Sequence, residues 1–81
     1  MPAIIREGDK DSAGQTKLGG STDVLVNDLK VHRKDDVDSA GHAAVGASPT
    51  VFANDLPVHR TGDADSSGHT AGAGSPDTFA N

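Results

Sequence analysis

The sequence has no cysteine, tryptophan or tyrosine, and its only large aromatic side chains are those of Phe52 and Phe79. The absence of cysteine excludes disulfides and thiolate metal sites. A domain of 81 residues is also small, and such a domain buries only about 60–65% of the surface that its unfolded chain exposes. Small folds offset this with disulfides, a metal ion or assembly, so a metal or a partner is expected here.

Basic residues and long apolar runs are also scarce. The net charge is −5 and divides as −1, −1 and −3 over consecutive thirds of the chain. No basic stripe exists, which argues against a nucleic-acid partner. No apolar run approaches the roughly 20 residues of a membrane-spanning helix, and residues 1–11 lack the apolar segment of a signal peptide. We therefore expect a protein that stays in the cytoplasm until another component moves it.

The chain has a repeat of 27 residues. Asp55–Asn81 matches Asp28–Asn54 at 16 of 27 positions without a gap, and Met1–Asn27 matches the middle copy at 10 of 27 positions. A fixed period of this kind dictates the architecture. We predict a single domain over residues 1–81, built from repeats 1–27, 28–54 and 55–81.

Short β-prone runs flank an Asn-Asp pair at each junction between repeats. Val24–Val26 and Leu29–Arg33 are separated only by Asn27 and Asp28, and Val51–Ala53 precedes the same pair in the next copy. A two-residue connection predicts a tight hairpin, because Asn and Asp tolerate the positive φ of such turns. Leu56–Arg60, which contains Pro57, is the second arm of that hairpin. Pro57 lacks an amide hydrogen and needs an unpaired position.

The segments between hairpins are rich in Gly, Ala, Ser and Asp and show no helical periodicity. Residues 34–48 and 61–75 fit either crowded loops at an apex or flexible loops. The fold class expected is therefore all-β: a small pseudo-three-fold domain of three β-hairpin repeats with loops at the apex. Residues 3–5 and 78–80 are the two arms of a third hairpin, so we predict that they pair antiparallel and bring Met1 and Asn81 together.

Phe52 and Phe79 occupy matched positions in the second and third repeats, and Leu25 has the equivalent place in the first. We expect the apolar strand residues, these three among them, to form a common core. Hydrophobic or unpaired strand surface should be exposed at one end of the molecule as a docking face.

All four histidines lie in the second and third repeats, as two sets of equivalent residues: His32 with His59, and His42 with His69. The first repeat has Ile5 and Gln15 at these places. Four neutral imidazoles are the right number and type for a tetrahedral zinc site. Six-coordinate iron would need more nitrogen ligands than four histidines supply. The alternative is that the histidines were copied when the unit duplicated and hold no metal.

Each repeat also contains the pattern Asp-x-Asp-Ser-x-Gly. The pattern starts at Asp9, Asp36 and Asp63. It is similar to the first half of a calcium loop, but the twelfth position, which should be Glu, is Gly or Ala in every copy. We interpret these carboxylates as turn formers that accept hydrogen bonds from nearby backbone amides.

An arginine precedes each of these loops by three residues. Arg6, Arg33 and Arg60 are each expected to pair with an aspartate of the following loop and so fix the corner between strand and loop. No serine lies in a nucleophile elbow, and the chain is too small to enclose a substrate pocket. We therefore expect no enzyme activity.

Several motifs resemble those of the PAAR-repeat family. They are Pro57-Val58-His59-Arg60 before Gly62-Asp63, then Gly74-Ser75-Pro76 before a β run, and Pro2-Ala3-Ile4-Ile5-Arg6 before Gly8-Asp9. The resemblance covers the whole chain. Family members are small cones that cap the trimeric spike of type VI secretion systems and of contractile phage tails. They hold a zinc ion near the point with histidines and often a cysteine, which this chain lacks.

The resemblance implies a membrane-piercing tip that binds a homotrimeric spike with one chain per trimer and meets the membrane of a target cell. By resemblance, His32, His42, His59 and His69 are the zinc ligands. Many members carry a toxin domain; this chain has no room for one, so effector cargo would be a separate partner. The protein would assemble in the cytoplasm and end at the tip of the injection machine. The alternatives are a free-standing small zinc-binding protein and a disordered segment.

Overall fold

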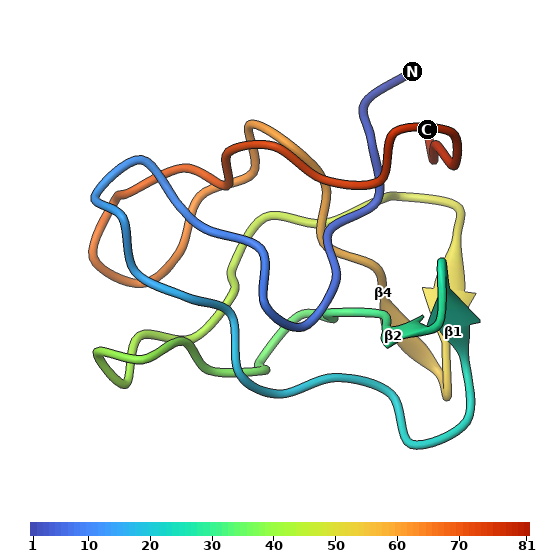
Figure 1. The fold of residues 1–81 in the computed structure, drawn as a ribbon, viewed down its shortest axis with the longest axis horizontal. Coiled ribbons are helices and arrows are strands. Elements are labelled where there is room, and N and C mark those ends of the chain that lie inside the picture. Colours follow the sequence, from blue (N-terminus) through green and yellow to red (C-terminus); the bar gives the residue numbers. More distant parts are fainter.

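The computed structural model describes residues 1–81 and contains strands but no helix. Its strands are β1 (Leu25–Val26), β2 (Leu29–Lys30), β3 (Phe52–Ala53) and β4 (Leu56–Pro57). β1 pairs with β2, and β3 pairs with β4, both antiparallel (Figure 1). The all-β class is confirmed. The second arm of each hairpin is shorter than predicted. The Val31 and Val58 amides still donate to Val24 and Val51 of the first arm, but from these residues onward the backbone also pairs with other segments.

The two hairpin turns have the predicted chemistry. Asn27 and Asp28 have φ of 54° and 67°, and Asn54 and Asp55 have φ of 53° and 68°. Positive φ at both central residues is the geometry of the type I′ turn, whose twist matches that of the flanking strands. Pro57 lies opposite Phe52 in a pair that exchanges no hydrogen bonds, since the next amide of the arm, that of Val58, donates to Val51. Its missing N–H therefore costs no ladder bond.

The two ends of the chain pair with each other, as predicted. Ala3 and Phe79 form an antiparallel bridge. The Ile4 amide donates to the Thr78 carbonyl at 3.0 Å, and the Ala80 amide donates to the Pro2 carbonyl at 3.0 Å. Figure 1 shows the N- and C-termini next to each other.

Isolated bridges also join the repeats to one another. The bridges between strand arms are Ile4 with Arg60, Arg6 with Val31, and Arg33 with Val58. Within the loops, equivalent bridges close Lys10 onto Thr16, Val37 onto Ala43, and Ala64 onto Thr70. Figure 1 shows the hairpins towards one side of the molecule and these three loops, coloured blue, green and orange, towards the other.

The core is made of small and β-branched side chains. It consists of Ile4, Val31, Ala53, Val58 and Ala80, each at most 6% exposed. The first, second and fourth of these residues are equivalent by the 27-residue period.

Apolar strand residues form the core as predicted, but the inclusion of Leu25, Phe52 and Phe79 is wrong, because these side chains are 54%, 56% and 47% exposed. Successive side chains of a strand point to opposite faces. The residues next to them on the turn side are Val26, Ala53 and Ala80, and these face the core. The larger neighbours therefore point outward. We refer to Leu25, Phe52 and Phe79 as the apolar trio.

Candidate metal centre

An arginine–aspartate pair fixes the start of each loop. The Arg33 Nε donates to Asp36 Oδ2 at 2.9 Å, and the Asp36 Oδ2 also accepts from the Arg33 backbone N–H at 2.9 Å. Equivalent pairs join Arg6 to Asp9 and Arg60 to Asp63. The hydrogen bonds that Arg33 donates to the Asp36 carboxylate raise the pKa of Arg33 above its usual value. The predicted ion pairs at the corners are therefore confirmed.

The second aspartate of each Asp-x-Asp motif lies deeper in the molecule. These residues are Asp11, Asp38 and Asp65, which are 6%, 1% and 4% exposed. In each, Oδ1 accepts hydrogen bonds from the backbone amides two and four residues later, at 2.9–3.0 Å. The predicted role of these residues as turn formers is thereby confirmed.

The other oxygen of each of these three carboxylates has no such partner. Oδ2 of Asp11, Asp38 and Asp65 is buried without any hydrogen bond. The three side chains place ligand atoms within 4.8 Å of one another. We call them the carboxylate cluster. Like charges held together away from water repel one another unless a cation compensates them.

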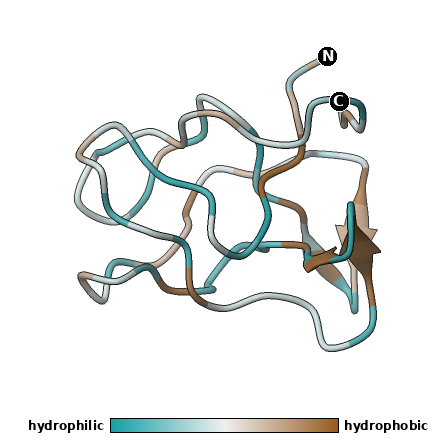
Figure 2. Ribbon diagram, viewed as in Figure 1, coloured by the Kyte–Doolittle hydropathy of each residue, from teal (hydrophilic) through white to brown (hydrophobic).

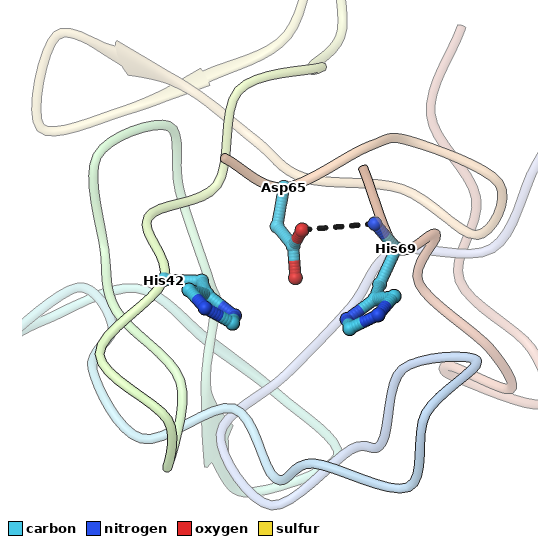
Figure 3. Close-up of side chains that lie close together, drawn as sticks. All are labelled: His42, Asp65 and His69. Carbon is cyan, nitrogen blue, oxygen red and sulfur yellow. Dashed lines mark hydrogen bonds between the residues drawn. The ribbon is translucent and has the colours of Figure 1, made fainter. Parts of the chain in front are cut away.

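Two of the four histidines border this cluster. The rings of His42 and His69 have centroids 6.0 Å apart, and their ligand atoms lie within 4.8 Å of each other and of Asp65 (Figure 3). We call them the outer pair, because their side chains are 32% and 38% exposed. The His42 Nδ1 lies 3.9 Å from Asp38 Oδ2, and the His69 Nδ1 lies 3.8 Å from Asp11 Oδ2.

The other two histidines are fully buried. The rings of His32 and His59 have centroids 5.5 Å apart in a T-shaped arrangement, and both residues are 0% exposed. We call them the inner pair. Their Nδ1 atoms lie 2.6 and 2.7 Å from the carbonyls of Gly19 and Gly46. A carbonyl only accepts, so Nδ1 carries the proton and Nε2 carries the lone pair. Neither Nε2 has a partner.

Burial controls the protonation of the inner pair. Loss of hydration lowers the pKa of His32 to about 4, although the bond to Gly19 opposes this change. Burial also lowers the pKa of His59. Both imidazoles are therefore neutral near pH 7, the form in which histidine can hold a metal.

The structure brings the four predicted ligands together as two pairs. The clusters whose ligand atoms all lie within 4.8 Å of one another include the outer pair but neither residue of the inner pair. A single zinc bound by His32, His42, His59 and His69 stays a prediction, and it would require the two pairs to approach each other.

A buried lysine also lies in this region. Lys17 is 1% exposed, and its Nζ has no hydrogen-bond partner. The equivalent residues of the other repeats are Ala44 and Ala71. Burial opposes ionisation of Asp65, but hydrogen bonds from Ser67 and from backbone amides, together with the charge of Lys17, lower the pKa of Asp65 to about 2. The charge of Lys17 therefore stabilises the ionised form of Asp65, a member of the carboxylate cluster.

Sequence reasoning found the histidines but missed the carboxylate cluster and Lys17. The recurrence of the second aspartate in all three copies was the available signal, since equivalent residues of repeats that meet at a common centre converge. Lys17 gave no signal, because lysine is almost never fully buried.

Comparison with protein-family models and with curated proteins gives no match. No segment forms a helix with the length and apolar character needed to cross a bilayer.

Proposed function

We propose that the protein is a structural, membrane-piercing tip that caps the homotrimeric spike of a contractile injection machine, with one chain per trimer. The proposed architecture is a closed cone with pseudo-three-fold symmetry. Support comes from three cross-strand pairs, Leu25–Lys30, Phe52–Pro57 and Phe79–Ala3. A step of 27 residues takes each pair to the next, and the last pair joins the two ends of the chain.

The observation that carries the function is the apolar trio. Leu25, Phe52 and Phe79 occupy equivalent positions in the three repeats, and all are about half exposed. Figure 2 shows strong hydrophobic colour on the hairpin strands. Exposed apolar side chains of this kind favour a protein partner. A homotrimer offers three identical surfaces about one axis, and three equivalent side chains in a single chain match them.

The three loops at the end opposite the hairpins are rigid, which suits a surface that must be pushed against a target membrane. Each loop is fixed at its start by an arginine–aspartate pair and is closed within itself by a short bridge. A tip that must transmit force cannot rely on flexible loops. The chain would assemble in the cytoplasm and act at the end of the machine.

A bound zinc ion is proposed to stabilise this tip. The outer pair fits a zinc site, because its imidazole nitrogens lie beside a carboxylate oxygen of Asp65. The inner pair fits less well, because it lies outside that cluster. When bound, the ion would supply binding free energy that the small core lacks.

A free-standing small zinc-binding protein is the second candidate. The outer pair favours it, since its side chains are 32% and 38% exposed and an ion could reach these imidazoles from solvent.

The decisive test is stoichiometry. The purified chain is mixed with trimeric spike proteins of phage tails and of type VI secretion systems, and the mass of each complex is measured by light scattering. A complex of one chain with one trimer is expected. Failure to bind any spike, or binding of three chains per trimer, would contradict the tip and leave the metal-binding protein as the better reading.

A further inference from the structure

We propose that the carboxylate cluster is the centre of a divalent-cation site, in which Asp11, Asp38 and Asp65 each supply Oδ2, the outer pair supplies imidazole nitrogen and Gln15 supplies its amide oxygen. The ion expected is a six-coordinate divalent metal of the Mn²⁺ or Fe²⁺ type, which would take the place of the zinc ion proposed above for the outer pair. The site stands whether or not the chain caps a spike, because it depends only on residues inside the loops.

The first support is that the two oxygens of each carboxylate differ in their hydrogen bonds. Oδ1 accepts two backbone hydrogen bonds and holds the turn, whereas Oδ2 is buried without a partner in all three residues. Buried polar atoms are normally satisfied by protein or by bound solvent or ions. Three unsatisfied carboxylate oxygens on side chains whose ligand atoms lie within 4.8 Å of one another are therefore oriented for a common ligand with positive charge.

The second support comes from side chains that are not acidic. The His42 Nδ1 is buried without a hydrogen bond, 3.9 Å from Asp38 Oδ2. The His69 Nδ1 lies 3.8 Å from Asp11 Oδ2. Gln15 has the equivalent place in the first repeat, and its Oε1 is also buried and unpartnered. Each repeat thus contributes one carboxylate and, four residues later, one further metal-ligating side chain.

The third support is the charge balance. The three carboxylates and the ammonium of Lys17, all less than one-tenth exposed, carry a formal charge of −2. A divalent cation would neutralise this charge. The charge of Lys17 also acts on His32 and His59. The inner pair is a poorer metal site than the carboxylate cluster. It offers only two imidazoles, because the equivalent residue of the first repeat is Ile5, and the charge of the nearby Lys17 ammonium repels a metal ion.

The donor set decides which ion is favoured. Three carboxylates, one amide oxygen and two imidazoles make six donors, four of them oxygen. Tetrahedral structural zinc prefers nitrogen and sulfur ligands, whereas oxygen-rich octahedral sets suit Mn²⁺, and imidazole also suits Fe²⁺. Mn²⁺ is the practical probe, because its spectroscopic signal reports directly on binding.

The test measures Mn²⁺ binding to the full chain after treatment with a chelator, by calorimetry and by electron paramagnetic resonance. One ion per chain is expected. Asp38→Asn retains an oxygen for the turn but removes a charge, and should weaken binding at least about tenfold. Asp28→Asn makes the same change of charge at an exposed turn residue and should bind like the unaltered protein.

The midpoint temperature of thermal unfolding, measured with and without Mn²⁺, separates a loss of metal binding from a loss of folding in the Asp38→Asn variant. Without metal, Asp38→Asn should melt at a temperature equal to or higher than that of the unaltered chain, because one repelling charge is gone. With Mn²⁺, only the unaltered chain should gain stability. A lower midpoint without metal, together with unchanged Mn²⁺ affinity, would show that Asp38 serves the turn alone and would overturn the proposal.

Two substitutions separate this ligand set from four histidines. His42→Leu removes the donor at position 42, and His32→Ile introduces the residue found at position 5. The first should weaken Mn²⁺ binding and the second should not. Equal losses of binding in both variants would favour one four-histidine centre instead.

Lys17→Met tests the charge balance. Removing a buried ammonium near the ion should tighten Mn²⁺ binding by more than about tenfold. Weaker binding in this variant would contradict the proposed balance.

Discussion

Ala3 and Phe79 face each other across an antiparallel bridge, although they lie at opposite ends of the sequence. The same relationship joins Leu25 to Lys30 and Phe52 to Pro57 within the two hairpins. The ends of the chain therefore take the place of a third turn.

A circular permutant follows from this pairing. A chain opened between Asn27 and Asp28 and joined from Asn81 to Met1 should keep the fold, because both sites are exposed turn positions. Its free energy of unfolding should lie within roughly 1 kcal/mol of that of the original chain, as measured by chemical denaturation. A permutant opened between the buried residues Val31 and His32 is the control and should be strongly destabilised. Equal stability of the two permutants would contradict this prediction.

The arginine–aspartate corner should contribute measurably to stability. Asp36→Asn should cost about 1.5–3 kcal/mol, because partly buried, charge-assisted hydrogen bonds to Arg33 are lost. A double-mutant cycle with Arg33→Gln should show a favourable coupling between the two side chains. Asp35→Gly is the matched control: Asp35 has φ of 76°, and the other repeats have glycine there. This change should stay within about 1 kcal/mol of zero. A coupling energy near zero would mean that solvent replaces the pair.

The inner histidine pair should make stability dependent on pH in metal-free protein. The folded chain holds the pKa of His32 at about 4 through burial, below the ordinary value of 6.5. Between these values the unfolded chain binds more protons, so stability is full above pH 6.5 and falls as pH drops towards 4. The contribution of His32 over this range is roughly 3 kcal/mol.

Thermal melts between pH 4 and pH 7 check this dependence. His32→Ile, which copies the first repeat, should flatten the curve over that range even if its absolute stability differs. His59 should add a loss in the same direction, since burial lowers its pKa too. An unchanged slope in the variant would mean that the imidazole of His32 takes up its proton equally well in both states.

The apolar trio should govern attachment to a spike. Replacing Leu25, Phe52 and Phe79 by serine should weaken binding by more than about 100-fold, since central apolar contacts are often worth 2 kcal/mol or more each. The fold should be retained, because the three side chains are about half exposed. The control is the double change of Val37 and Val45 to serine. These residues are 43% and 53% exposed but lie outside the hairpins. A trio variant that binds as tightly as the unaltered chain would rule out this face for docking.

The sequence alone predicted the features that depend on local residue chemistry or on the 27-residue register. The Asn27–Asp28 turn follows from residue type alone, since few residues accept two consecutive positive φ angles. The pairing of Ala3 with Phe79 follows from counting in steps of 27. The corner at Arg33 was likewise accessible, because it joins residues only three apart.

The sequence did not predict the directions in which individual side chains point. A strand of two residues shows no alternation, so nothing in the sequence indicated that Ala53 faces the core and Phe52 faces solvent. The recurrence of the second aspartate indicated that these carboxylates could converge, but a turn-forming aspartate gives no sign of where its second oxygen points. The burial of Lys17 was not predicted either, because lysine is almost never fully buried.

The hydrogen bonds of Ile4 have a consequence for the time course of folding. Its amide donates to Thr78, and its carbonyl accepts from Ser75 at 2.9 Å. Residues near the start of the chain therefore cannot satisfy their backbone until residues near its end have left the ribosome. Closing such a long loop costs conformational entropy before any contact forms to offset it. Folds dominated by distant pairings therefore form slowly, over milliseconds to seconds. The exposed β-prone segments of the nascent chain must stay unpaired for that interval, so early association between copies competes with folding at high rates of synthesis.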